Sequence, residues 1–160
     1  MSISFHAVNE EGTNWLGKVL AKRLPPGSVV SLIGTLGAGK TRLVQAVAQS
    51  LGVAEGEVTS PTFVLIKEYA GERPIYHFDT YRLRDEDEFM ELGPDEYFDA
   101  DGLSFVEWGD RVEPILPTDR LDILDEVEDV TARRFTLSRR GDFPEEIFES
   151  IRADLEKAPL

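Results

Sequence analysis

The stretch GTLGAGKT at residues 34–41 decides the fold, because it matches the phosphate-loop pattern G-x-x-x-x-G-K-[ST] at every fixed position. The apolar run SVVSLI at residues 28–33 leads directly into it, and apolar side chains at helical spacing follow it up to Gly52. A glycine loop between a strand and a helix points backbone N–H groups at an anion, and the helix dipole adds partial positive charge. A chance glycine-rich turn, the alternative, does not account for both flanks. The stretch therefore predicts a nucleoside triphosphate site.

The last two residues of this loop carry side chains with a defined chemistry. We expect Lys40 to reach the β- and γ-phosphates and the Thr41 hydroxyl to ligate Mg²⁺. Such a site also needs an acid at the end of a buried strand, and two strands end that way, at Asp79 and at Glu107. Either acid could simply cap the turn after its strand, and periodicity alone does not choose between them. The hydroxyl cluster at residues 59–62 (TSPT) is either a γ-phosphate-sensing loop or a polar turn fixed by proline.

The remaining pattern predicts one domain over residues 1–160, with a core at about 10–140 and a C-terminal helix at about 144–157. Strands alternate with helices around the loop, which indicates a phosphate-loop NTPase three-layer sandwich with a mixed sheet containing a β-hairpin. The expected elements are helices at 10–24 and from Pro144, strands at 28–33, 63–69, 75–79, 103–107, 121–127 and 133–137, and a partly helical acidic insertion at 85–99.

Composition excludes several classes of site. The chain has no cysteine, so disulfides, thiol catalysis and cysteine-based zinc sites are excluded, and its two histidines make a multi-histidine metal site a poor hypothesis. There is no apolar run of membrane-spanning length and no secretory signal pattern at the N-terminus, from which we expect a cytoplasmic location and no membrane partner.

The net charge of −14 opposes direct binding to a phosphate backbone. The arginine pairs at 82/84, 133/134 and 139/140 are too sparse to form a convincing basic patch. From Asp85 to Asp110 there are eleven acidic residues and no lysine or arginine, which is either a solvated face or a docking surface for a basic partner.

Four motifs in order resemble the TsaE (YjeE) family: the phosphate loop, SPTF at 60–63, HFDTYR at 77–82 and VEW at 106–108. The resemblance covers about residues 10–134. That family is the ATPase component of the bacterial machinery that makes threonylcarbamoyladenosine (t6A) at position 37 of tRNA. It implies ATP and Mg²⁺ as cofactors, the proteins TsaD and TsaB as partners, and at most indirect contact with tRNA.

The resemblance also implies roles for particular residues. Thr41 and Glu107 would hold Mg²⁺, Lys40 and the loop amides of Gly37, Ala38 and Gly39 would bind the phosphates, and Asp79 would have a catalytic or switch role. Thr13 and an arginine, Arg133 or Arg134, would lie near the nucleotide. Residues 60–62 would lie in the first switch loop, and Trp108 beside the metal ligand. The family usually has aspartate where this chain has Thr35, a position that contributes mainly backbone.

The sequence therefore predicts a Mg²⁺-dependent ATPase that is slow alone and stimulated by its partner. A small-molecule or nucleotide kinase of the phosphate-loop class is the alternative, but such enzymes need an arginine-rich lid, and the segment after Arg84 is acidic. A GTPase would carry an Asn-Lys-x-Asp motif, which is missing, because the only asparagines are Asn9 and Asn14. A nucleotide-gated interaction module without turnover differs from an ATPase in whether it releases phosphate.

Overall fold

The chain folds around one seven-stranded sheet in the order β1-β7-β6-β2-β5-β4-β3. This computed structural model describes residues 1–34, 39–59 and 66–159. Along the chain the elements are β1 (Ser2–Ala7), α1 (Glu10–Arg23), β2 (Val29–Gly34), α2 (Lys40–Ser50), β3 (Ile66–Ala70), β4 (Pro74–Asp79), α3 (Glu86–Met90), α4 (Pro94–Phe98), β5 (Leu103–Glu107), the 3₁₀-helix η1 (Gly109–Ile115), β6 (Arg120–Val127), β7 (Arg133–Arg140) and α5 (Glu145–Glu156).

The centre of the sheet is parallel and both edges are antiparallel. Strand β2 pairs in parallel with β5 on one side and β6 on the other, and β4 pairs in parallel with β5. Antiparallel partners complete the sheet, with the β3–β4 hairpin at one edge and β7 and β1 at the other. The carboxyl ends of β2, β4, β5 and β6 therefore meet at one edge of the sheet, where ligands bind in open α/β folds.

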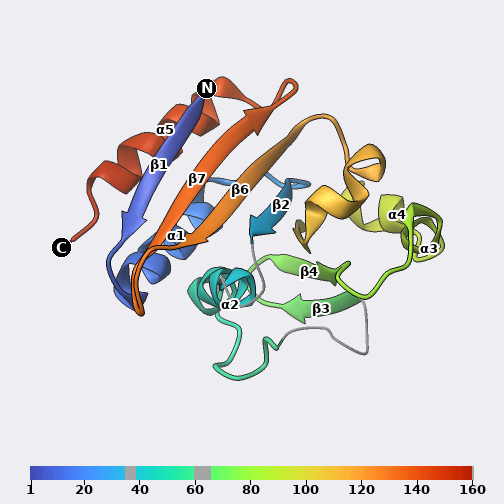
Figure 1. Cartoon of the computed structure of the whole chain (residues 1–160), viewed down its shortest axis with the longest axis horizontal. Helices are drawn as coiled ribbons and strands as arrows, with labels where there is room; N and C mark the ends of the chain where they lie inside the picture. Colours follow the sequence, from blue (N-terminus) through green and yellow to red (C-terminus); the bar gives the residue numbers. More distant parts are fainter. Residues whose placement is uncertain (35–38, 60–65, 160) are drawn as a thin grey trace.

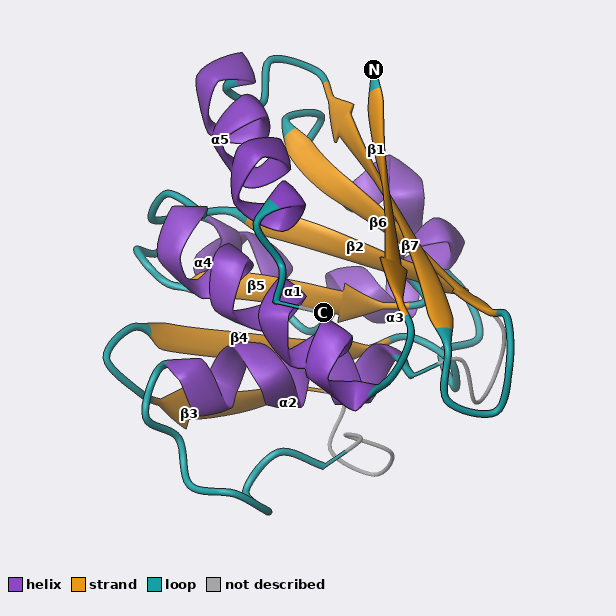
Figure 2. Ribbon diagram, turned by 90° about the vertical axis from the view of Figure 1, so that its left-hand side faces the viewer, coloured by secondary structure: helices purple, strands orange, loops and turns teal. Residues whose placement is uncertain are grey.

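Helices cover the two faces of the sheet unequally. The larger apolar core joins α1, α2 and α5 to one face, and a second core joins α3, α4 and η1 to the other face around Phe78 and Val106. In Figure 1 the strands β1, β7 and β6 face the viewer with α1 and α5 behind them, and Figure 2 shows α1, α2 and α5 together along the sheet. This arrangement fixes the start of α2 at the edge where the parallel strands end.

The packing of α1 on α2 depends on one small residue. The Gly17 backbone lies so close to α2 that a Cβ atom there would be 2.5 Å from the Ala46 Cβ. At its N-terminus α1 is capped by Asn9, whose side-chain oxygen accepts a hydrogen bond from the Gly12 N–H. Close contact with α1 holds α2, and with it the residues that follow the phosphate loop, against the sheet.

The structure confirms the predicted α/β class, the mixed sheet and its hairpin. The predicted helices correspond to α1, α2 and α5, and the acidic insertion is partly helical through α3 and α4. Two elements were not predicted, namely the edge strand β1 and the 3₁₀-helix η1. Part of the predicted strand at 63–69 lies outside the described residues, and β3 is described from Ile66.

Candidate nucleotide and metal site

The predicted functional residues come together at the carboxyl edge of the parallel strands. Glu107 is the last residue of β5 and lies beside Asp79, the last residue of β4. On the other side of β5, Glu107 is level with Leu32 of the strand that leads into the phosphate loop. Because α2 begins at Lys40, the lysine and both acids meet where the loop strand ends.

Thr41 and Glu107, the two expected metal ligands, are in direct contact. The Thr41 hydroxyl donates a hydrogen bond of 2.7 Å to Oε2 of Glu107, and the Glu107 residue is only 4% exposed. A hydroxyl and a carboxylate are hard oxygen donors, which suit Mg²⁺, an ion that takes few protein ligands and keeps its other positions for phosphate and water. No cluster of three or more acidic or histidine side chains suited to a metal occurs among the described residues. The pair thus fits Mg²⁺ held jointly by protein and phosphate.

Two further side chains hold Glu107 from behind. His77, fully buried on β4, contacts the same Oε2 atom through its Nε2 nitrogen. The Thr80 hydroxyl is within hydrogen-bonding distance of two backbone carbonyls, 3.1 Å from that of Glu107 and 2.8 Å from that of Trp108. These contacts tie the ends of β4 and β5 together and fix the carboxylate in place. Sequence reasoning assigned no role to either residue.

The Lys40 side chain is buried beside this pair. Its Nζ donates a hydrogen bond of 3.1 Å to the Gly34 carbonyl and lies 3.9 Å from the centre of the Trp108 ring. Burial lowers the pKa of Lys40, while nearby carboxylates, Glu107 first, act in the opposite direction. The result is an ammonium group with little water around it, placed where the loop strand ends.

Trp108 adopts a strained backbone conformation directly after Glu107, the expected metal ligand. It is the only non-glycine residue in the described part of the chain with positive φ, at φ 60° and ψ 37°. A bulky side chain in the left-handed region costs roughly 1–3 kcal/mol and persists only where surrounding contacts impose it. Here the Trp108 ring contacts both Lys40 and Tyr81, and the centres of the Trp108 and Tyr81 rings are 5.0 Å apart. This backbone conformation places the indole against Lys40.

Asp79 is also buried, at 7% exposed, and accepts a hydrogen bond of 2.9 Å from the Tyr81 N–H. That bond orders the turn after β4, which carries Thr80 and Tyr81. Asp79 therefore has a turn-capping function as well as a place beside Glu107.

The expected nucleotide neighbours Thr13 and Arg133 line one pocket, together with Gly39. Its volume is about 180 Å³, and Glu10, Arg42, Val130, Thr131 and Phe135 complete the wall. Arg134, the alternative that the sequence left open, pairs with Glu128 at 3.2 Å and does not line this pocket. Of the two arginines that the sequence left open, Arg133 is therefore the one that lines the pocket beside Gly39.

A buried acid that sequence reasoning missed lies under the same loop. Asp125 on β6 is paired with Gly34 across the sheet, and its carboxylate oxygens have no hydrogen-bond partner among the described residues. Burial raises the pKa of Asp125 to about 7, opposed by the positive charges of Arg133 and Lys40. Its Oδ2 lies 3.4 Å from where a Cβ on Gly39 would be, and Gly39 has a φ of 111° that favours glycine. The phosphate-loop glycine and this acid are therefore immediate neighbours.

Several predicted positions fall outside the described residues. These are Gly37 and Ala38 of the phosphate loop and residues 60–62 of the expected switch loop. Their assigned roles stay predictions.

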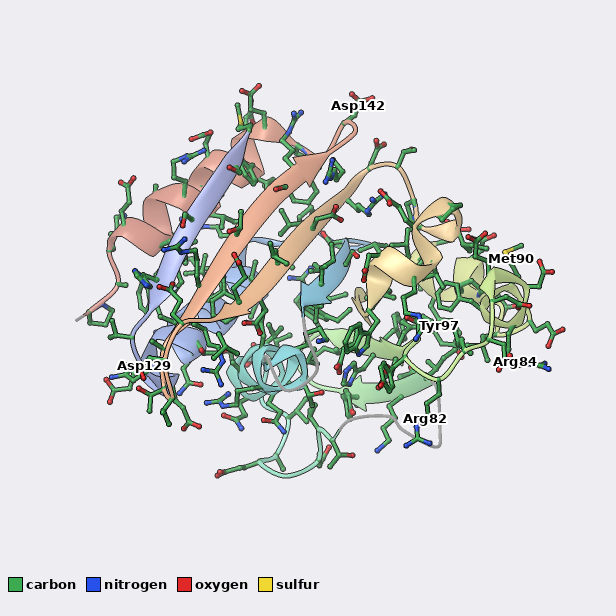
Figure 3. All side chains as sticks on the ribbon, viewed as in Figure 1. Arg82, Arg84, Met90, Tyr97, Asp129 and Asp142 are labelled. Carbon is green, nitrogen blue, oxygen red and sulfur yellow. The ribbon has the colours of Figure 1, made fainter. Side chains whose placement is uncertain are left out.

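The acidic insertion forms the outer end of the molecule beyond β4 and β5. Arg84, just before α3, forms an ion pair with Glu88 at 2.8 Å, and Met90 at the end of α3 is 52% exposed. Figure 3 shows Arg84 and Met90 at this outer edge.

Within the described ranges, no helix is long and apolar enough to cross a membrane. The cytoplasmic location expected from the sequence stays a prediction.

Comparison with known proteins gives consistent matches over most of the chain. A model of the family "Threonylcarbamoyl adenosine biosynthesis protein TsaE" matches residues 7–135. A protein of Bacillus subtilis named tRNA threonylcarbamoyladenosine biosynthesis protein TsaE is 40% identical over 150 residues, 93% of each chain. A Synechocystis protein of the same name is 41% identical over 122 residues, 73% of this chain and 76% of the relative. The crystal structure of YdiB from Bacillus subtilis superposes with a TM-score of 0.79 at 35% identity, covering 96% of this chain and 95% of that one.

Proposed function

Because the chain belongs to the TsaE family of threonylcarbamoyl adenosine biosynthesis proteins, we propose that it is the Mg²⁺-dependent ATPase subunit of tRNA t6A biosynthesis. It acts together with TsaD and TsaB, and it does not itself carry out the transfer to adenosine. The observation that carries the proposal is the Thr41–Glu107 contact beside the buried Lys40, at the end of the loop strand. A metal-bound triphosphate site of this class uses a hydroxyl and a carboxylate for the metal ion and an ammonium group for the phosphates.

Each side chain has a defined task in this proposal. Lys40 exchanges the Gly34 carbonyl for phosphate oxygens, a short movement for a side chain already at the loop. Thr41 and Glu107 would hold Mg²⁺, and the ion would supply positive charge that stabilises the phosphoryl oxygens. Asp79, next to Glu107 on the neighbouring strand, orients the attacking water. Thr13 and Arg133 bind the nucleoside end of ATP in the pocket beside Gly39.

The decisive experiment is reconstitution of t6A formation. Purified chain is combined with TsaD, TsaB, tRNA, ATP and the components that supply the threonylcarbamoyl group, and t6A is measured by mass spectrometry of digested tRNA. We expect repeated rounds of modification that depend on the chain. The Lys40→Ala variant should lose this activity, because it removes the cation of the loop.

A control separates catalysis from assembly. Thr41→Ser keeps the hydroxyl and should retain activity, whereas Thr41→Ala removes the expected metal ligand and should not. Modification that proceeds equally well without the chain, or with Lys40→Ala, would contradict the proposal. Rapid phosphorylation of a small metabolite would favour a kinase instead.

A further inference from the structure

His77 is in direct contact with Glu107, the expected metal ligand. It lies in the middle of β4 and is fully buried, and its Nε2 contacts Oε2 of Glu107. The same oxygen accepts the Thr41 hydroxyl at 2.7 Å. A carboxylate that is only 4% exposed loses most of its hydration, which destabilises the charged form unless hydrogen-bond donors replace the water. Thr41 and His77 are those donors.

On its other side the imidazole meets Tyr69 of the neighbouring strand β3. The Tyr69 hydroxyl lies 3.4 Å from Nδ1 of His77, and the two ring centres are 6.1 Å apart. The same hydroxyl is 3.4 Å from the carbonyl oxygen of Thr59. Polar contacts therefore run from Glu107 on β5, through β4, to β3 and the carbonyl of Thr59.

The chemistry of the partners sets the hydrogen positions. A carboxylate only accepts, so Nε2 of His77 carries the hydrogen that points at Glu107. The Tyr69 hydroxyl, which donates to the Thr59 carbonyl, lies against Nδ1 on the opposite side of the ring. Burial raises the pKa of the Tyr69 hydroxyl, which keeps that donor protonated. The tyrosine thereby contacts the imidazole on the side away from Glu107 and limits its movement.

We propose that His77 is a positioning residue of the metal site, which holds the Glu107 carboxylate in its metal-binding orientation with Tyr69 as its support. This inference rests on the proposed function, because it concerns the same Mg²⁺ site. If the Thr41 hydroxyl turned from Glu107 to a bound metal ion, Oε2 would lose one of its two donors. His77 then remains as the donor that keeps the carboxylate from rotating. Partners behind a metal ligand typically contribute a factor of about 10–100 in metal affinity.

The test replaces His77 with glutamine or asparagine, whose side-chain amides extend to different distances from the backbone. The side-chain nitrogen of His77→Gln lies where Nε2 was and can still donate to Glu107, whereas that of His77→Asn lies near Nδ1 and falls short. For each variant, ATP affinity is measured by calorimetry in EDTA and across a Mg²⁺ titration. Binding of Mn²⁺ in place of Mg²⁺ is followed by electron paramagnetic resonance.

We expect His77→Asn to weaken metal affinity about 10–100-fold while ATP affinity in EDTA is unchanged. His77→Gln should stay within a few-fold of the wild type. Tyr69→Phe, which deletes only the hydroxyl, should weaken metal affinity by a smaller factor. A merely space-filling histidine would lower thermal stability in both His77 variants and leave their metal affinities equal.

Equal metal affinity in the asparagine and glutamine variants would therefore overturn the inference. If His77→Asn does not fold, Tyr69→Phe takes its place, and wild-type metal affinity in that variant contradicts the proposed support. A failure of the proposed function looks different, because the wild-type protein itself would then bind ATP without regard to Mg²⁺.

Discussion

The ammonium group of Lys40 lies 3.9 Å from the centre of the Trp108 ring while it donates a hydrogen bond to the Gly34 carbonyl. A cation over an indole face is stabilised by roughly 0.5–2 kcal/mol, more when water is excluded. To place its ring over Lys40, Trp108 adopts a left-handed backbone conformation that is energetically unfavourable for a bulky residue. The ring thus holds the lysine at the loop, and any movement of the lysine toward a phosphate changes the environment of the indole.

Tryptophan fluorescence should therefore report nucleotide binding. The chain has two tryptophans, and Trp15 is bonded through its indole N–H to the Asp154 carbonyl, away from the loop. In the Trp15→Phe variant, addition of Mg²⁺ and ATP should change the emission of Trp108. The matched variant Trp108→Phe should show no such change, although its phenyl ring still covers Lys40 and ATP affinity stays within about threefold. A nucleotide-dependent signal from Trp15 alone would contradict this arrangement.

Isosteric amides separate the two acids at the strand ends. Glu107→Gln keeps a side-chain oxygen for Thr41 but removes the charge, so we expect at least a roughly tenfold loss of Mg²⁺ affinity in calorimetry. Asp79→Asn keeps the acceptor for the Tyr81 N–H, and it should bind ATP normally while turnover falls roughly 100-fold. Exchanged phenotypes would reverse the two assignments.

Asp125 makes the free energy of unfolding depend on pH, and the sign follows from its raised pKa. Its pKa is raised by burial to about 7, against about 3.9 in an unfolded chain, so the folded protein binds this proton more tightly. Stability therefore falls as pH rises between these two values and stays reduced above pH 7. Asp125→Asn cannot ionise, and its stability relative to wild type should improve by on the order of 2 kcal/mol from pH 5 to pH 8.

Thermal unfolding at the two pH values measures this difference without nucleotide. The control is Asp142→Asn, at the exposed turn between β7 and α5 (Figure 3), which should shift stability equally at both pH values. A pH-independent effect of Asp125→Asn would show that the carboxyl is charged in both states.

Much of this architecture could be predicted because its signals are local. The phosphate loop requires a strand before it and a helix after it, and both are present as β2 and α2. The apolar run ending in Glu107 forms β5, which lies directly beside the loop strand, so the contact with Thr41 follows from the fold. The edge strand β1 was missed, although Ile3, Phe5 and Ala7 alternate with polar residues at a strand spacing.

The supporting residues of the site were harder to predict, because each depends on tertiary packing. His77 and Asp125 had a weak signal, since each follows an apolar residue two positions earlier, Ile75 and Ile123, on a buried face of its strand. That spacing places a polar group in the core without saying what it meets there. The positive φ of Trp108 has no local signal, because contacts from Lys40 and Tyr81 select it.

As an ATPase subunit of the proposed kind, the chain should depend on its partner for turnover. Within the loop motif Lys40 is the only cationic residue, and no lysine or arginine occurs between Arg84 and Arg111. An arginine supplied in trans can accelerate phosphoryl transfer on the order of a thousandfold or more. The acidic surface over α3 and α4 suits a basic partner that would bring such a group or order the site.

Steady-state phosphate release at fixed Mg²⁺ and ATP tests this claim most directly, first with the chain alone and then with TsaD and TsaB added, with Lys40→Ala as the blank. We predict slow release from the chain alone, well below the roughly ten per second of an ordinary enzyme, and a marked rise with the partners. Release that never exceeds the Lys40→Ala blank, or full turnover that ignores the partners, would contradict the account.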